Sequence, residues 1–116
     1  MSMDSLIFDA LKGLVASRVY PDVAPEKAGK PYITYQQVGG VAVNFVDPTI
    51  PGKKNGRYQI SIWGKTRLEV AALASSVENT LRVVTALQTH IMSAPVSMYE
   101  LETKLYGTRQ DFSFWL

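Results

Sequence analysis

The sequence predicts an α+β protein, a two-layer domain with two helices on one face of a mainly antiparallel, four-stranded sheet. Apolar residues recur at helical spacing in two segments of the chain and with period two in four others. The order of these segments is α-β-β-α-β-β, and a chain of 116 residues is enough for a single domain, residues 1–116. The predicted helices span residues 4–17 and 66–86, and the predicted strands span residues 32–38, 57–63, 96–105 and 109–115.

The first predicted helix, residues 4–17, has one apolar stripe and a polar start. Asp4 or Ser5 is expected to cap its N-terminus. The stripe consists of Leu6, Ile7, Ala10, Leu11, Leu14 and Val15. Three prolines then exclude regular structure from about residue 20 to 31, and the last of them, Pro31, can open the strand at 32–38.

Residues 39–56 are the least regular stretch of the sequence, and we expect them to project from the domain as a long loop. The loop contains the turn signals Asp-Pro at 47–48, Pro-Gly at 51–52 and Asn-Gly at 55–56. Lys53, Lys54 and Arg57 give it a small basic tip. A loop of this length within a compact domain is usually functional or mobile.

The second predicted helix has the clearest start in the chain. Thr66 and Glu69 have the spacing of a capping box, with Thr66 as the N-cap. Glu78 and Arg82 lie four residues apart in the order that favours a helix. The apolar stripe consists of Val70, Leu73, Val77, Leu81 and Val84.

The last two strands are expected to form a hairpin about Gly-Thr at 107–108, the sequence of a two-residue type II′ turn. This register places Lys104 opposite Asp111 and Leu101 opposite Phe114. A register shifted by two would oppose like charges, which is unfavourable.

Residues 57–63 and 109–115 share Arg, Ser and Trp at the same spacing, which suggests that an αββ unit is used twice. In both segments Ile or Phe faces the core, so Arg57, Arg109, Trp63 and Trp115 face the other side of the sheet. A free monomer gains little from two tryptophans there, whereas contact with further copies could bury them. The alternative is that a helix or loop of the same chain covers each of them.

Composition limits the function classes. There are no cysteines, which excludes disulfides and thiolate sites and fits a reducing cytoplasm. The net charge of +2, from 12 basic and 10 acidic residues, is too small to predict a strong nucleic-acid surface. The N-terminus lacks the basic run of a secretory signal, and no apolar run reaches the ~20 residues that span a bilayer. We expect a soluble, intracellular protein.

No motif predicts catalysis, a cofactor or a metal. The single histidine, His90, has no second His or Cys with which to hold a transition metal. Glu100 and Glu102 share a predicted strand face with Lys104, which is typical of a solvated surface. Gly-Lys-Thr at 64–66 lacks the upstream glycine of a phosphate-binding loop. We therefore expect no enzyme and no cofactor.

Read in order, four segments resemble the small tail completion proteins (tail terminators, head–tail joining proteins) of long-tailed bacteriophages and prophages. They are Val-Tyr-Pro at 19–21 with Pro-Tyr-Ile-Thr-Tyr at 31–35, Tyr-Gln-Ile-Ser-Ile-Trp at 58–63, Tyr-Glu-Leu-Glu-Thr at 99–103 and Arg-Gln-Asp-Phe-Ser-Phe-Trp at 109–115. The resemblance implies a non-enzymatic virion assembly protein whose ring, typically a hexamer, caps the tail tube and meets the head connector. It implies the tube protein and the connector as partners, no membrane, and a place at the head-proximal end of the tail after assembly in the host cytoplasm.

The ring that the resemblance implies needs two different complementary patches on each subunit, because a closed contact between identical subunits is heterologous. Our candidates for the subunit interface are Trp63, Trp115, Arg57 and Arg109, and the two tryptophans, on the same side of the sheet, are candidates for one of the two patches. Our candidates for contact with the tube, the connector or the lumen are Phe45, Asp47, Lys53 and Lys54, where non-specific contact with passing DNA is also possible.

Three other functions stay open at this point. The first is a small α+β binding module, dimeric through a sheet edge, with a cellular partner. The second is an enzyme on a ferredoxin-like sheet, which would need convergent polar groups that the sequence does not show. The third is a single-strand nucleic-acid binder that uses Tyr32, Tyr35, Tyr58 and the basic tip, against which the small net charge argues.

Overall fold

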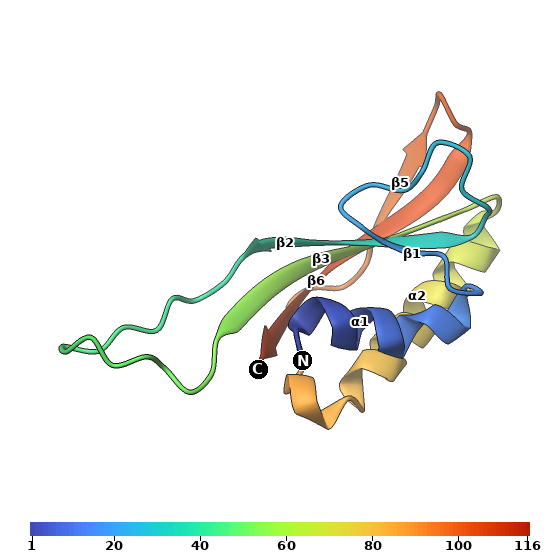
Figure 1. The fold of residues 1–116 in the computed structure, drawn as a ribbon. Helices are drawn as coiled ribbons and strands as arrows, with labels where there is room; N and C mark the ends of the chain where they lie inside the picture. The colour runs from blue at the N-terminus through green and yellow to red at the C-terminus, as the bar shows by residue number, and fades with distance from the viewer.

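The computed structural model describes residues 1–116 and consists of a six-stranded sheet with two α-helices packed on one face (Figure 1). The strand order is β1-β2-β3-β6-β4, and β5 also pairs with β6. The elements are α1 (Met3–Leu11), η1 (Lys12–Leu14), β1 (Val19–Pro21), β2 (Tyr32–Gly39), β3 (Asn55–Gly64), α2 (Arg67–Arg82), η2 (Thr85–Leu87), β4 (His90–Ile91), β5 (Val96–Glu100) and β6 (Leu105–Trp115). The α+β class and the helix layer are confirmed, whereas the prediction of four strands is wrong.

The two additional strands are short and occur where the sequence predicts loops. β1 has three residues and pairs in parallel with β2, and β4 has two residues and pairs with β6. Segments this short carry no readable alternation, and Pro21 ends β1. The four predicted strands correspond to β2, β3, β5 and β6, and their pairings with one another are all antiparallel.

The first helix begins and ends earlier than predicted. Its N-cap is Ser2, whose Oγ accepts a hydrogen bond from the Ser5 N–H at 3.1 Å, while the Ser5 Oγ accepts one from the Ser2 N–H. Ser5 is therefore the N3 residue of a capping box, and the predicted cap at Asp4 or Ser5 is wrong. The α-helix changes to a 3₁₀ turn at Lys12, and positive φ angles at Ala16 and Ser17 turn the chain toward β1.

The second helix confirms the predicted cap. The Glu69 N–H donates to the Thr66 Oγ1 at 3.2 Å, although the Glu69 carboxylate accepts from the N–H of Lys65 and not of Thr66. Glu78 and Arg82 form the expected ion pair at 3.6 Å. The helix ends at Arg82, four residues before the predicted end, and a 3₁₀ turn follows.

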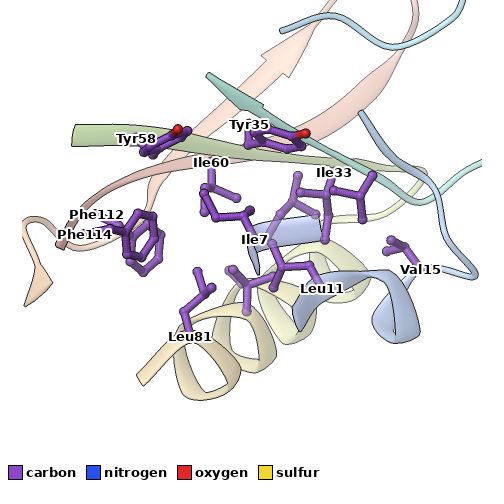
Figure 2. Close-up of a cluster of buried hydrophobic side chains, with 14 of the residues drawn as sticks. Ile7, Leu11, Val15, Ile33, Tyr35, Tyr58, Ile60, Leu81, Phe112 and Phe114 are labelled. Carbon is purple, nitrogen blue, oxygen red and sulfur yellow. The ribbon is translucent and has the colours of Figure 1, made fainter. Parts of the chain in front are cut away.

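The core lies between the helices and the sheet and contains 16 buried residues (Figure 2). Both predicted helical stripes contribute to it, and α1 and α2 lie side by side beneath β2, β3 and β6. The rings of Phe112 and Phe114 stack with their centroids 6.0 Å apart, and Tyr58 packs against Phe114 at 5.6 Å. The Ile and Phe positions of the two similar strand segments therefore face the core, as predicted.

The C-terminal hairpin does not turn where the sequence predicts. The turn consists of residues 101–104, and β5 pairs with β6 from Glu100 opposite Leu105 to Val96 opposite Arg109. Lys104 adopts the left-handed conformation at φ 57°, so the predicted pairs Lys104–Asp111 and Leu101–Phe114 are wrong. Gly107 lies inside β6, where its missing side chain makes room for the indole of Trp63, since a Cβ there would lie 2.7 Å from the ring.

No helix combines the length and the apolar character that crossing a membrane requires.

Candidate functional site

The most distinctive surface of the molecule is a projecting segment, residues 40–53, which we call the arm. It joins β2 to β3 and extends far beyond the end of the sheet (Figure 1). The arm makes the molecule elongated, with extents of 52 × 25 × 25 Å. The long loop predicted at residues 39–56 corresponds to the arm, although Gly39 belongs to β2 and the last two residues, Asn55 and Gly56, belong to β3.

The arm exposes apolar side chains that the rest of the chain does not cover. Val41, Phe45, Val46 and Ile50 each expose more than half of their surface. None of the backbone-to-backbone hydrogen bonds outside the helices and strands involves an arm residue. The arm therefore presents unpaired peptide groups together with apolar side chains, the combination that favours pairing with another chain.

The base of the arm is held by one side chain, Asn55. Its Nδ2 donates to the Ser113 Oγ at 2.8 Å and to the Phe114 carbonyl at 3.0 Å, and its Oδ1 accepts from the Val41 N–H at 2.7 Å. Gly40 approaches so closely that a Cβ there would lie 2.6 Å from the Asn55 carbonyl oxygen. Asn55 thus fixes both limbs of the arm to β6.

The tip of the arm has a polar turn. The Asp47 carboxylate accepts a hydrogen bond from the Thr49 N–H at 2.9 Å. Hydrogen bonds from the side chain and the backbone of Thr49 lower the pKa of Asp47 below its usual value. Lys53 and Lys54 are exposed where the arm returns to β3, and the Lys54 backbone pairs with Leu116. Phe45, Asp47, Lys53 and Lys54 therefore all lie on or beside the arm.

A groove runs along the base of the arm on the open face of the sheet, the face opposite the helices. Its lining combines apolar and polar side chains with one cation. The lining residues are Val38, Gly40, Val41, Asn55, Arg57, Met92 and Ser113.

The open face carries an ion pair next to this groove. The Asp111 Oδ2 accepts from the Arg57 Nη2 at 2.6 Å and from its Nε at 3.0 Å. Gln59, opposite Asp111 in the ladder, adds a long contact of 3.4 Å. Arg109 is exposed and lies opposite Ser61, so the two predicted arginines lie on one face with different surroundings.

The two tryptophans lie on the predicted face but at opposite ends of it. Trp63 pairs with Gly107 and Trp115 pairs with Asn55, which puts them about 26 Å apart along the ladder at ~3.3 Å per residue. Trp63 is half-buried, with its ring over Gly107, and Trp115 is half-buried near the base of the arm. They therefore cannot form one shared patch.

Another apolar surface lies at the end of the sheet away from the arm, and we call it the far-end surface. It comprises Val96, Tyr99, Glu100, Leu101 and Glu102. Val96 and Tyr99 expose about half of their area and Leu101 exposes 79 %. Leu105 in β6 is buried, whereas Tyr99 and Leu101 are exposed, because β5 pairs on one side only and residue 101 lies in the turn.

The far-end surface is tied to the second helix by Arg67. Its Nη2 donates to the Met98 carbonyl at 3.2 Å and its Nη1 to the Gly107 carbonyl at 3.3 Å. The guanidinium also lies 5.5 Å from the centre of the Tyr106 ring. β5 is therefore held firmly on its inner side while its outer edge stays free.

The structure brings together no group of three or more His, Asp or Glu side chains that could hold a metal. Glu102 lies in the turn and Glu100 accepts from the Thr103 hydroxyl at 2.7 Å, so the two glutamates do not share a strand face as predicted. His90 is exposed on β4.

Two features of the site are missing from the sequence-based candidates. Asn55 carries a turn signal in the sequence, whereas its role as an anchor depends on Ser113 and Phe114, more than fifty positions away. The exposed character of Val96 and Tyr99 follows from the position of β5 at a sheet edge, which periodicity alone cannot show.

Comparison with known proteins supplies the context for these surfaces. The family model described as "Tail completion protein gp17" matches residues 7–116. No curated protein sequence matches the chain. Among solved structures, a chain in "Virion of native gene transfer agent (GTA) particle" is similar in fold, with a TM-score of 0.59 and 11 % sequence identity over 98 % of this chain and 93 % of that chain.

Proposed function

The chain belongs to the tail completion protein gp17 family, and from this premise we propose that it forms a homo-oligomeric ring, a hexamer, that caps the tail tube and joins it to the head connector. Membership makes it a structural protein of phage tail assembly, located in the virion. The ring, its position at the head-proximal end of the tail and its assembly in the host cytoplasm belong to the proposal.

The observation that carries the proposal is the uncovered arm. Its exposed apolar side chains and unpaired peptide groups gain nothing in a free monomer. A protein that acts by contact with other subunits, and not by chemistry, has a use for such a segment.

The proposed mechanism is steric. A ring seated on the finished tube covers the surface to which the next tube subunits would add, so growth stops. The opposite side of the ring then meets the connector. Phe45, Asp47, Lys53 and Lys54, the candidates for contact with the tube, the connector or the lumen, all lie on or beside the arm, which is therefore the proposed contact segment.

The open face supports a closed ring in one further respect. A heterologous contact needs two different patches on each subunit. Trp63 with Arg109 lies toward one end of the open face, and Trp115 with Arg57 lies toward the other. We assign them to opposite sides of the subunit, where each meets a different neighbour.

The first test is the solution mass by light scattering after size-exclusion chromatography at several concentrations. A particle of six times the 12.8 kDa chain supports the ring. A dimer whose mass does not change with concentration supports instead a binding module that pairs through the free edge of β5. If the free chain is monomeric, the same protein is added to cognate tail tubes. Failure to bind the tube ends would contradict the proposal.

The tryptophans provide the second test. Trp63→Ala and Trp115→Ala should each weaken ring assembly by about 2 kcal/mol or more, as at interface hot spots. Val83→Ala is the matched control, since Val83 is exposed next to the helix layer and away from both proposed patches. Full-size rings at unchanged concentration in both tryptophan variants would exclude these residues from the interface.

A further inference from the structure

The arm and the far-end surface lie at opposite ends of the elongated molecule (Figure 1). A single copy therefore cannot bring them together. Any contact between them joins two copies, and because the two surfaces differ, that contact is heterologous.

The arm has unpaired peptide groups, and the far-end surface has a free strand edge with which they could pair. Its peptide groups make no backbone pairs, and its apolar side chains Val41, Val46 and Ile50 are exposed. β5 pairs only with β6, so its outer edge offers free N–H and C=O groups between the exposed side chains of Val96 and Tyr99. An extended segment can add to such an edge through main-chain hydrogen bonds, while its alternate side chains pack on the apolar surface.

The two surfaces also carry opposite charges. Lys53 and Lys54 are exposed side by side at the return of the arm. Glu100 and Glu102 are exposed on the far-end surface, with Lys104 as the only cation in the same turn. Complementary charges of this kind fix register and partner choice.

We propose that the arm of one copy lies along the outer edge of β5 in the next copy, with Lys53 and Lys54 facing Glu100 and Glu102. Each subunit then gives an arm on one side and receives one on the other, and the repeat closes into a ring. This inference rests on the proposed ring and names the contact that holds it together. The alternative, which the experiments must exclude, is that the arm contacts the tail tube and not a second copy of the chain.

Charge reversal tests the contact. The variant Lys53→Glu with Lys54→Glu should raise the concentration needed for half-assembly about ten-fold, because two attractive pairs become repulsive. Adding Glu100→Lys and Glu102→Lys to the same chain should restore assembly. Lys12→Glu with Arg82→Glu makes the same charge change on the exposed surface of the helix layer and should leave assembly as it is. Thermal unfolding of each variant shows whether the fold is kept.

Cross-linking provides an independent test, because the chain has no cysteine of its own. A chain with Lys53→Cys and Glu100→Cys, treated with a short bis-maleimide, should give a ladder of covalent oligomers up to the ring. Each single-cysteine chain should stay a monomer on the denaturing gel. The reaction is run on free rings or, if rings form only on tubes, on protein bound to tail-tube ends.

The outcomes separate this inference from the proposed function. Rings that form normally, with no ladder and no effect of charge reversal, overturn the arm contact and leave the ring. Capture of a tube subunit by the Lys53→Cys chain labelled with a maleimide–benzophenone photocross-linker, which does not need a cysteine on the tube, also overturns it and assigns the arm to the tube. Absence of rings both free and at tube ends overturns the proposed function itself.

Discussion

The sheet body and the arm obtain their order from different sources. The body encloses 16 core residues and leaves no buried side-chain nitrogen or oxygen without a hydrogen-bond partner. The arm encloses nothing, and a single side chain, Asn55, holds its base. The body is therefore stable by its own contacts, whereas the arm depends on a partner for whatever stability it gains.

Two phenylalanines test this difference most strongly. Phe112 is fully buried in the body and Phe45 exposes 53 % of its surface on the arm. Phe112→Ala should lower the free energy of unfolding by about 3–5 kcal/mol, because it removes a large side chain and leaves a cavity. Phe45→Ala should change it by less than ~0.5 kcal/mol, as is usual for surface positions. Urea denaturation of both variants measures the two values.

A large loss of monomer stability in Phe45→Ala would contradict this division, because it would mean that the arm packs on its own body. The same variant should still affect assembly if the arm meets a partner. Light scattering at matched concentrations separates the two effects.

Substitution of two glycines compares how much space surrounds the backbone in the body and in the arm. A Cβ at Gly107 would lie 2.7 Å from the Trp63 ring, whereas a Cβ at Gly52 would meet no atom within 4 Å. Gly107→Ala should therefore cost about 1–3 kcal/mol through overpacking. Gly52→Ala should be near neutral or slightly stabilising, because it restricts the unfolded chain. Thermal unfolding followed by circular dichroism distinguishes them, and equal midpoints would contradict the contact of Trp63 with Gly107.

Gly107 also shows why sequence patterns located the strands but not the turn between the last two. Alternation of Ile or Phe with polar residues correctly placed residues 57–63 and 109–115 in strands, although β6 begins earlier, at Leu105, since burial of one face is a local property of the sequence. The pair Gly107-Thr108 has the composition of a tight turn. Its actual place inside β6 depends on Trp63, which crosses it from another strand, and such a distant contact leaves no local signal.

The candidate site also has features that local sequence patterns predicted and features that depend on distant contacts. The face on which Trp63 and Trp115 lie followed from period two, and the projecting loop followed from its turn residues. Antiparallel pairing of the two similar segments puts the tryptophans at opposite ends, which the chain order alone does not reveal. The anchoring contacts of Asn55 join residues more than fifty positions apart and are equally invisible to a local pattern.

Two asparagines test how firmly the body holds the arm. Asn55 makes three hydrogen bonds at the base, whereas Asn44 is exposed on the arm itself. Asn55→Ala should cost about 1–2 kcal/mol, because half-buried partners lose their hydrogen bonds. It should also speed proteolytic cleavage within residues 40–53. Asn44→Ala should change neither quantity, and equal cleavage rates in the two variants would show that Asn55 does not restrain the arm.

Substitution of Tyr58 should give the smallest change in stability. It tests whether the buried part of the body extends as far as the base of the arm. Its hydroxyl donates to the Asp4 Oδ1 at 2.6 Å. Burial, together with this hydrogen bond, raises the pKa of Tyr58 well above the ordinary tyrosine value of 10.0. The folded state therefore holds the proton more tightly than the unfolded state, so this contribution to stability is complete below about pH 10 and is lost as the pH rises further.

Tyr58→Phe should therefore lower stability at pH 7 by about 1 kcal/mol through the lost hydrogen bond and make the decline above pH 10 shallower. Burial also raises the pKa of Tyr32 and Tyr35, so part of the decline should persist. Tyr99→Phe removes a hydroxyl from the far-end surface and, as an exposed-site control, should leave the stability at pH 7 unchanged. Urea midpoints measured from pH 7 to 11 give the slopes. An unchanged slope in Tyr58→Phe would mean that Tyr58 is open to solvent, and that the body ends short of the base of the arm.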